Sequence, residues 1–452
     1  MSFKSASFGS LFSSPQKNGL TRPKSVRGSG IPMVNMGELF AHSRIHNISM
    51  DLVPVGDGEA HFLLQSEDLL FARQSLVLAG AGQCSIFVGN QLPTVFESHI
   101  IRCRLNKTIS NPYFYFYFFR SPSGRTAIET IAEQGAGASG IRGSDLVKLS
   151  VPCPPKAYQD SVAEVLTSLD DRITLLRETN STLEAIAQAL FKSWFVDFDP
   201  VRAKQEGREP EGMDADTASL FPDSFEESEL GLVPKGWRGK SLDTIAEYLN
   251  GLALQKFPPD EDDWLPVIKI AQLRKGDTNG ADRANRRLKS EYIIQNGDVL
   301  FSWSGSLEVV VWCGGEGALN QHLFKVTSKD YPKWFYYFWT KHHLVSFQQT
   351  AASKATTMGH IQRKHLTEAK VVAPPIEIIQ AISVYFAPLL ERWITNELKA
   401  QTLATLRDTL LPRLISGQLR LPDAETTDDE VLIQLVKDRQ EEHSVKVSLD
   451  EL

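Results

Sequence analysis

The stretch DSVAEVLTSLDDRITLLRETNSTLEAIAQALFKSWFVDFDPV, residues 160–201, decides the fold of this chain. Its seam positions recur at alternating steps of four and three residues, which is the spacing of a helix that packs lengthwise on another helix. These positions are Val162, Leu166, Leu169, Ile173, Leu176, Asn180, Leu183, Ala187, Leu190 and Trp194. We therefore expect one long helix that ends at Asp199-Pro200.

The partner of this helix lies in the same chain, 220 residues further on. At that offset the seam positions read Ile382, Phe386, Leu389, Trp393, Asn396, Ala400, Leu403, Arg407, Leu410 and Leu414. Only Asn396 and Arg407 replace an apolar residue. We favour antiparallel packing, because parallel packing would crowd both globular parts at one end. A helical hairpin that serves only for dimerisation is the alternative that periodicity leaves open.

The repeat extends upstream of the two helices. Pro154-Pro155 corresponds to Pro374-Pro375 at the same offset, whereas Asp68 corresponds to Asp298 at 230 and Asn18 to Asn250 at 232. A constant offset in the helices and a drifting one before them indicate two copies of one unit. Each copy is a variable globular part followed by a helix of fixed length.

Each globular part alternates strand-like runs with a helix. In the first copy we expect strands at residues 31–34, 69–72, 85–88 and 99–105, a helix from Pro112, a glycine-rich loop at 135–140 and a strand at 148–155. In the second we expect strands at 265–270 and 298–303, a helix from Pro332 and a long helix that stops at Pro412 and Gly417.

The sequence thus predicts an α+β protein, with two similar mixed α/β domains joined by two long helices in an antiparallel coiled coil with internal pseudo-two-fold symmetry. The expected divisions are a first domain at residues 1–153, a central helix at 154–200, an acidic linker at 201–236, a second domain at 237–373, a C-terminal helix at 374–418 and an acidic tail at 419–452.

The composition is that of an ordinary globular chain, with 42% hydrophobic and 23% charged residues. No run of 18 apolar residues and no secretory signal pattern occurs, so we expect a cytoplasmic protein that binds no membrane. The four cysteines are scattered, without metal-ligand spacing. The net charge of -7 comes from the tail and linker, where residues 421–452 hold 10 acidic against 3 basic side chains. The globular parts are left slightly basic, which permits contact with DNA.

No catalytic motif is complete. Residues 111–114 (NPYF) lack the second proline of an amino-methyltransferase signature, and residues 239–241 (GKS) lack the first glycine of a phosphate loop. Residues 368–370 (EAK) have nuclease-like spacing without an upstream Pro-Asp. We expect no catalytic and no metal-ligating residue. A self-sufficient adenine methyltransferase or nuclease, and a coiled-coil scaffold without DNA affinity, remain as alternatives.

Five segments carry a family resemblance: ALFKSWFVDFDPVRAK (189–204), SELGLVPKGW (228–237), ALNQHLF (318–324), TTMGHIQRKHL (356–366) and LLPRLISGQL (410–419). They resemble the specificity subunit of type I restriction-modification systems, and together with the repeat they cover nearly the whole chain. The resemblance implies that the two domains are target-recognition domains, each reading one half of a split, asymmetric DNA site whose spacing the helices set.

The resemblance also implies partners and their cofactors. Two modification subunits would use S-adenosylmethionine to methylate adenine, and restriction subunits would use ATP and Mg to translocate and cut double-stranded DNA. This chain would hold no cofactor itself and would supply only the DNA sequence specificity of the complex.

The resemblance assigns no DNA-contacting residue, so we infer candidates from side-chain chemistry on loops that the repeat makes equivalent. Lys and Arg suit phosphates, and forked or amide side chains suit base edges. In the first domain the candidates are Arg22, Lys24, Arg27, Arg73, Arg142 and Ser144. In the second they are Gln255, Lys256, Trp303, Ser304, Gln321, His322, Gln362, Arg363 and Lys364.

A second stripe beside the helix seam consists of Phe191, Phe195 and Phe198. Aromatic side chains away from the seam need cover. They are candidates for binding a partner subunit, and packing on the chain's own second domain is an equal alternative.

Overall fold

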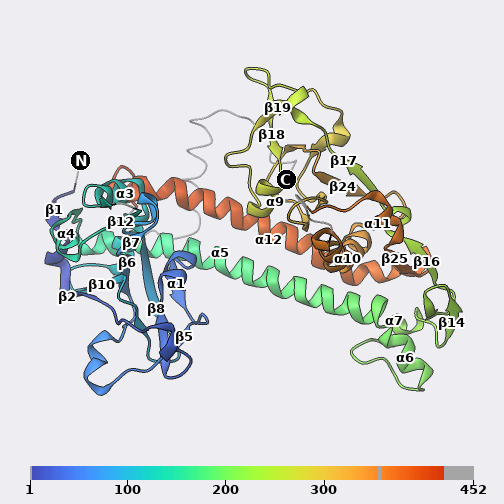
Figure 1. The fold of residues 1–452 in the computed structure, drawn as a ribbon, viewed down its shortest axis with the longest axis horizontal. Coiled ribbons are helices and arrows are strands. Elements are labelled where there is room, and N and C mark those ends of the chain that lie inside the picture. The colour runs from blue at the N-terminus through green and yellow to red at the C-terminus, as the bar shows by residue number, and fades with distance from the viewer. Residues whose placement is uncertain (1–2, 136, 354–358, 422–452) are drawn as a thin grey trace. The chain divides into compact units, whose positions relative to one another are not determined.

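The structure, a computed structural model, describes residues 3–135, 137–353 and 359–421 (Figure 1). The chain divides into two compact units: unit 1 comprises residues 1–172 and 403–452, and unit 2 comprises residues 173–402. Two long helices, α5 (Lys156–Phe191) and α12 (Ile376–Ser416), contribute residues to both units. The prediction of two long helices is therefore confirmed.

Unit 1 is built around a five-stranded sheet in the order β2-β10-β6-β8-β4. Its strands are β1 (Ser5–Ser7), β2 (Phe12–Asn18), β3 (Ile31–Val34), β4 (Arg44–His46), β5 (Asp51–Val53), β6 (Asp68–Ala72), β7 (Gln74–Ser75), β8 (Cys84–Gly89), β9 (Val95–Phe96), β10 (Ile100–Leu105), β11 (Glu133–Gly135), β12 (Ala138–Gly140) and β13 (Ser150–Pro152). Its helices besides the long pair are α1 (Met36–Ala41), α2 (Pro112–Arg120), α3 (Pro122–Glu129) and α4 (Gly143–Lys148).

Unit 2 holds two four-stranded sheets, β17-β24-β21-β22 and β19-β18-β23-β20. Its strands are β14 (Phe225–Ser228), β15 (Gly231–Pro234), β16 (Arg238–Ser241), β17 (Glu247–Asn250), β18 (Trp264–Ile268), β19 (Arg283–Asn285), β20 (Ile293–Ile294), β21 (Val299–Ser302), β22 (Val309–Val311), β23 (Gly317–Leu319), β24 (Leu323–Thr327) and β25 (Lys370–Ala373). Its shorter helices are α6 (Asp199–Gln205), α7 (Ala215–Ser219), α8 (Leu242–Ile245), α9 (Ile270–Lys275), α10 (Lys333–Ser353) and α11 (Arg363–Glu368).

The repeat predicted from the sequence holds at the level of strand pairing. The order β2-β10-β6-β8 in unit 1 recurs as β17-β24-β21-β22 in unit 2. The parallel pair β3 and β9 recurs as the parallel pair β18 and β23, and each has an antiparallel neighbour on the other side. The two units are thus two copies of one mixed α/β fold.

The Asn-Gly-Leu sequence occurs in both copies because only glycine fits its second position. A Cβ atom on Gly19 would lie 2.0 Å from the carbonyl oxygen of Phe96, and one on Gly251 would lie 2.3 Å from that of Asn320. Real Cβ atoms do not approach backbone oxygens this closely. The same close approach of two chain segments is therefore built into both units.

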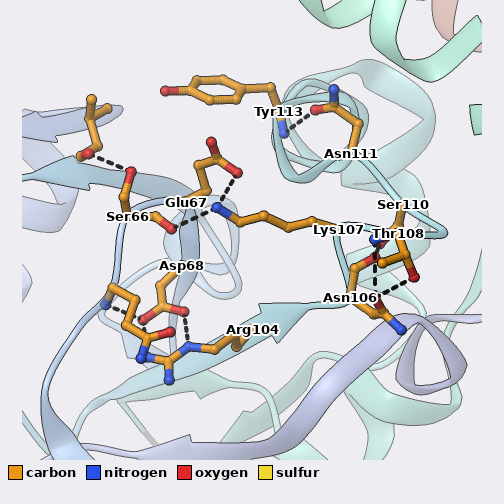
Figure 2. A network of polar contacts seen from close by, with 12 residues as sticks. Ser66, Glu67, Asp68, Arg104, Asn106, Lys107, Thr108, Ser110, Asn111 and Tyr113 are labelled. Atoms are coloured by element: carbon orange, nitrogen blue, oxygen red, sulfur yellow. Dashed lines mark hydrogen bonds and ion pairs between the residues drawn. The ribbon is translucent and has the colours of Figure 1, made fainter. Parts of the chain in front are cut away.

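The start of β6 shows how the copies diverge in sequence while keeping one backbone. Glu67 has a positive φ of 73°, and the equivalent residue of unit 2 is Gly297, with a φ of 87°. A non-glycine residue in this region is strained. In Figure 2 the Glu67 carboxylate pairs with Lys107 at 2.7 Å, and the buried Asp68 pairs with Arg104 at 2.7 Å. These ion pairs join the strained turn to β10 and the loop that follows it.

The two long helices run antiparallel within each unit, as expected. Residue numbers rise along α5 while those of the contacting residues fall along α12. The contacts are Tyr158 with Leu414 and Asp170 with Arg407 in unit 1, and Asn180 with Asn396 and Trp194 with Phe386 in unit 2. Most predicted seam positions are buried, among them Val162, Leu166, Ile173, Leu176, Ala187, Trp194, Ile382, Phe386, Ala400 and Leu414.

Two helix ends differ from the prediction. Helix α5 ends at Phe191 and is followed by a π-helical turn, η5 (Lys192–Val196). Phe198 then adopts a left-handed conformation, and Pro200 lies in the first turn of α6, so this proline starts a helix instead of ending one. In α12, Pro412 lies inside the helix, and Gly417, with a φ of +74°, marks its end.

Two segments expected to be loops or linkers have structure of their own. The glycine-rich residues 135–140 include parts of β11 and β12. The polar segment 201–236 contains α7 and the hairpin β14-β15 and is part of unit 2, in whose core Phe221 and Val233 are buried. The acidic, polar composition of residues 201–236 therefore does not correspond to an extended segment without secondary structure.

The four cysteines are free, and Cys84, Cys103 and Cys313 are buried. Burial raises the pKa of the Cys313 thiol to about 12. This agrees with the expectation that these residues act as small core side chains. In the part of the chain that the structure describes, no helix is long and apolar enough to cross a membrane.

Candidate nucleic-acid interface

A polar cluster in unit 2 gathers around Trp303, directly after β21. The indole N–H of Trp303 donates to Asn250 Oδ1 at 2.9 Å and to the carbonyl oxygen of Gln321 at 3.2 Å. The indole ring lies 5.8 Å from the His322 ring. The ends of β17 and β21 and the turn before β24 thus bring together four residues that are far apart in the sequence.

Ser304 and His322 are the next pair in this cluster. Ser304 Oγ lies 3.0 Å from His322 Nδ1, and the Gln321 amide nitrogen lies 3.4 Å from His322 Nε2. Ser304 is buried, whereas Gln321 and His322 are half-buried and keep part of their side chains accessible. Ser304 and Gln321 therefore engage both ring nitrogens of His322, and the half-buried Gln321 amide can offer a donor and an acceptor to base edges. We call Asn250, Trp303, Ser304, Gln321 and His322 the Trp303 cluster.

Arg363 lies beside the Trp303 cluster. Its guanidinium lies 5.7 Å from the centre of the Phe324 ring, which is itself 6.0 Å from the Trp303 ring. One guanidinium nitrogen donates to the carbonyl oxygen of Tyr248 at 3.2 Å. The structure therefore brings Trp303, Ser304, Gln321, His322 and Arg363 together.

The remaining candidates of unit 2 lie on neighbouring turns. Gln362 caps α11 and Lys364 is in its first turn, and both are exposed. Gln255 and Lys256 are exposed in the 3₁₀ turn η6 (Leu254–Lys256). This turn follows Leu252, whose carbonyl oxygen accepts from the Gln321 N–H at 2.9 Å. The geometry thus joins η6 to the Trp303 cluster through the backbone.

Unit 1 has the same backbone arrangement with different side chains. The Arg73 N–H donates to the His99 carbonyl at 2.8 Å, just as the Trp303 N–H donates to that of His322 at 3.3 Å. The Arg73 carbonyl accepts from Ile141 at 3.0 Å, and that of Trp303 from Ile361 at 2.9 Å. Arg73 therefore occupies the position of Trp303, and unit 1 presents a guanidinium where unit 2 presents an indole.

Three of the predicted arginines of unit 1 are engaged in ion pairs. Arg22 pairs with Glu59, and Arg27 pairs with Asp51 at 2.7 Å; their side chains are only 18% and 21% exposed. Arg142 pairs with Glu133 at 2.8 Å but remains 68% exposed. Arg22 and Arg27 thus hold the segment after β2 to its neighbours, whereas Arg142 stays accessible.

Lys24 and Lys256 are equivalent residues of the two copies. Lys24 begins the 3₁₀ turn η2 (Lys24–Val26), and Lys256 ends the corresponding turn η6. Both are exposed, as is Ser144 in the first turn of α4. Exposed lysines on equivalent turns suit contacts with DNA phosphates.

Asn250 belongs to the Trp303 cluster but was not among the sequence candidates. Its signal was present in the sequence, because Asn250 precedes the repeated Gly-Leu and corresponds to Asn18. Phe324 and His360, whose rings lie 6.0 and 6.4 Å from that of Trp303, were also missed. Their positions depend on strand pairing that the sequence pattern did not specify.

The phenylalanine stripe packs on the chain's own second unit. Phe191, Phe195 and Phe198 are 4%, 0% and 9% exposed. Their ring neighbours include Phe338, Trp334 and Trp237. The expectation of a partner-binding stripe is corrected accordingly: these rings are core residues and leave no exposed aromatic surface for another subunit.

The Asn111-Pro112 motif starts a helix, as we interpreted it. Asn111 Oδ1 accepts from the N–H group of Tyr113 at 2.9 Å (Figure 2) and from that of Phe114 at 3.3 Å, which caps α2. The Asn111 amide donates to Asp160 at 2.6 Å. Its side chain is therefore occupied by structural contacts. In the described ranges, no group of three or more His, Cys, Asp or Glu side chains could hold a metal ion.

Comparison with known proteins agrees with the repeat. The model of the type I restriction modification DNA specificity domain matches this chain twice, over residues 15–185 and 234–406. Each match spans one globular part and most of the helix that follows it. Together the two matches cover more than half of the chain.

Individual relatives carry the same description. The type I restriction enzyme HindI specificity subunit of Haemophilus influenzae is 26% identical over 441 residues, covering 86% of this chain and 94% of the relative. The MjaIX specificity subunit of Methanocaldococcus jannaschii is 25% identical over 321 residues, covering 69% of each chain.

A solved structure shares the fold. The crystal structure of the type I restriction-modification S subunit from M. genitalium superposes with a TM-score of 0.53 at 14% identity, covering 91% of this chain and 96% of that one. On the strength of the double family match, this chain belongs to the type I restriction modification DNA specificity domain family.

Proposed function

We propose that this chain is the specificity subunit of a type I restriction-modification complex and that each globular domain reads one half of a split, asymmetric DNA site. The observation that carries this proposal is the double family match, which falls once on each copy of the fold. In both copies the backbone makes the same hydrogen bonds at the strand end, around Arg73 in unit 1 and around Trp303 in unit 2. We assign recognition to residues 1–153 and 237–373.

The two half-sites would differ because the two interfaces differ chemically. Unit 2 offers the Trp303 cluster, with the Gln321 amide for base edges, and Arg363 and Lys364 for phosphates. Unit 1 offers Arg73, Arg142 and Lys24 at equivalent places. Arginine reads guanine well, whereas an amide reads adenine well, so different half-site sequences follow.

The two half-sites would be separated by a spacer whose sequence is not read. We propose that the helices of residues 154–200 and 374–418 set the length of this spacer. Each long helix contributes residues to both units, so a change in helix length would change the separation of the two domains. Helix α5 has 36 residues. At about 1.5 Å per residue this is longer than one turn of DNA, which is about 34 Å. We assign no reading role to residues 201–236 and 419–452.

The partners in this proposal are double-stranded DNA, two modification subunits and restriction subunits, assembled in the cytoplasm. The modification subunits would bring S-adenosylmethionine for adenine methylation, and the restriction subunits ATP and Mg for translocation and cleavage. The relatives named type I restriction enzyme specificity subunits support this assignment.

The test is to express the chain with its modification subunits in a host free of adenine methylation and to sequence the methylome. We expect one split motif with a methylated adenine in each half. Replacing residues 240–370 by the same segment of another family member should change one half only. A change in both halves would contradict the division into two independent readers, and S-adenosylmethionine binding by the isolated chain would favour a self-sufficient methyltransferase.

A further inference from the structure

Unit 1 carries an exposed apolar loop tip at Leu76 and Val77. Leu76 is 88% exposed and Val77 is 61% exposed, and Leu76 is the most exposed large apolar residue in the described part of the chain. Full exposure of a leucine forgoes a stabilisation of about 1.5–3 kcal/mol that burial would give. Such a residue suggests a surface that another molecule covers.

The tip belongs to an insertion that unit 2 lacks. In unit 1, twelve residues lie between the paired residues Phe71 and Cys84. In unit 2, seven residues lie between the paired residues Phe301 and Val309. The corresponding turn of unit 2 reads Ser304-Gly305-Ser306 and is polar. The additional residues therefore place two apolar side chains where the other copy has none.

The base of the loop holds the tip in the solvent. Arg125 donates to the carbonyl oxygens of Ala79 at 3.0 Å and Ala81 at 3.3 Å. Ser75, directly before the tip, pairs with Ser139 in the sheet β11-β12-β7, and its hydroxyl accepts from the Val77 N–H at 3.2 Å. The loop is thus a fixed turn and not a segment that can fold its apolar side chains into the core.

The charge beside the tip suits DNA. Arg73 begins the loop and occupies the position of Trp303, and in the described residues its guanidinium makes no hydrogen bond or ion pair. Arg142 follows Ile141, which donates to the Arg73 carbonyl at 3.0 Å; Arg142 is 68% exposed and pairs with Glu133 at 2.8 Å. The Arg73 guanidinium can neutralise a phosphate, and apolar side chains next to it match the major groove, where thymine presents a C5-methyl group.

We propose that Leu76 and Val77 recognise a thymine through its C5-methyl group in the half-site read by the first domain. This inference rests on the proposed function and adds to it a specificity-determining loop. Because unit 2 has serine and glycine at this turn, the second half-site has no methyl contact of this kind.

The test uses DNA that carries the split motif identified for the wild-type complex by methylome sequencing. In this DNA each thymine of the motif is replaced by uracil, one position at a time. Uracil keeps the hydrogen-bonding edge of thymine and lacks only the methyl group. The assembled wild-type methyltransferase should lose about fourfold in affinity at one position of the first half, the factor for one buried methyl group. The Leu76→Ser complex should bind the thymine site about tenfold or more weakly and should not distinguish thymine from uracil at that position.

Leu92→Ser is the matched control, because Leu92 is 55% exposed in the turn between β8 and β9 of the same unit. It should leave affinity and the thymine preference unchanged. A wild-type complex that reads a split site but binds every uracil substitution equally well would overturn this inference alone. A Leu76→Ser variant that assembles poorly with modification subunits, yet binds DNA normally once assembled, would assign the tip to a protein partner instead. If the wild-type complex methylates no split site, the proposed function fails and this inference fails with it.

Discussion

In unit 1 the contact between the two long helices includes an ion pair, whereas in unit 2 it includes a pair of asparagines and no charge at the equivalent positions. Asp170 accepts from the Tyr117 hydroxyl at 2.7 Å and pairs with Arg407 at 2.6 Å. The equivalent positions of unit 2 hold no charge; they are Tyr337, Leu390 and Ala187, all buried. One fold is therefore held to its helices in two different ways.

The same contrast recurs where each globular part joins its helix. In unit 1, Asn111 is bonded through its N–H to Gln159 at 2.8 Å and through its amide to Asp160 at 2.6 Å. In unit 2, aromatic rings fill this joint, with Trp334 stacked on Phe386 at 4.4 Å. Hydrogen bonds fix orientation for little net energy, whereas aromatic burial supplies most of the stability. We therefore expect the replacement of a single side chain at this joint to lower the free energy of unfolding more in unit 2 than in unit 1.

Phe195→Ala tests the aromatic joint and should have the largest effect. Phe195 is fully buried and lies 5.6 Å from Trp334 and 5.8 Å from Trp237. We expect the free energy of unfolding of unit 2 to fall by about 3–5 kcal/mol. All eight tryptophans of the chain lie in unit 2, so urea unfolding followed by tryptophan fluorescence isolates this unit.

Val345→Ala is the control for Phe195→Ala, because Val345 is 61% exposed on α10 of the same unit. It should shift the fluorescence transition by no more than about 0.5 kcal/mol. A Phe195→Ala transition within about 1 kcal/mol of the wild type would show that the aromatic joint relaxes around the cavity.

Asp170→Leu tests the charged group of unit 1. Breaking a fully buried ion pair costs about 3–5 kcal/mol. Because Asp170 and Arg407 are 14% and 27% exposed, we expect the free energy of unfolding of unit 1 to fall by less, about 2 kcal/mol. Adding Arg407→Ala installs the residues of unit 2 and should restore at least half of the loss, because it removes a partly buried guanidinium whose remaining partner is the exposed Asp408 at 2.7 Å. Hydrogen exchange of α2 amides measures this, and a double variant as unstable as the single one would contradict the explanation.

Asn111→Ala tests the polar joint of unit 1. The variant loses the cap of α2 and the bond to Asp160, and we expect unit 1 to lose about 1 kcal/mol. Asn111→Ser should recover most of this, because serine caps helices well but cannot reach the carboxylate in the same way. The protection of α2 amides against exchange separates the two contributions. Equal loss in both variants would place the energy in the Asp160 bond.

Lys24→Ala and Lys256→Ala should have the smallest effects on stability, within about 0.5 kcal/mol. If each lysine contacts one phosphate, each variant should reduce the salt dependence of DNA binding by the assembled complex by about 0.9 in log-log slope. The equivalent positions predict equal reductions. Lys364→Ala, on α11, extends the comparison, and a variant with unchanged slope and specificity removes that lysine from the interface.

Local periodicity was enough to predict the helices and most strands, and it failed where tertiary packing outweighs local preference. Pro412 removes a hydrogen bond from α12 near its end, but Leu411, Leu414 and Ile415 are buried around it, and their burial keeps the last turn helical. The stripe of Phe191, Phe195 and Phe198 indicated that these aromatic rings pack against another surface. Periodicity does not specify whether that surface belongs to this chain or to a partner.

The candidate interface was predicted in part. The repeat matched Trp303 with Arg73 and His322 with His99, and in unit 2 the structure brings the rings of Trp303 and His322 together. The ion pairs of Arg22 and Arg27 were not foreseen, because their partners, Glu59 and Asp51, are 37 and 24 residues away and depend on the folding of β3 against β5. A basic residue on a loop is therefore weak evidence for DNA contact until its partners are known.

The division of the chain into units has a consequence for the order of folding during synthesis. Unit 2 is one continuous segment, whereas unit 1 includes residues from 403 onward. The Tyr158 hydroxyl donates to the Leu414 carbonyl across 256 residues. At about 5–20 residues per second a ribosome needs roughly 10 to 50 s to make that acceptor. During this interval Tyr158 lacks its hydrogen-bond partner on α12, so the first domain to be synthesised is the last to be completed.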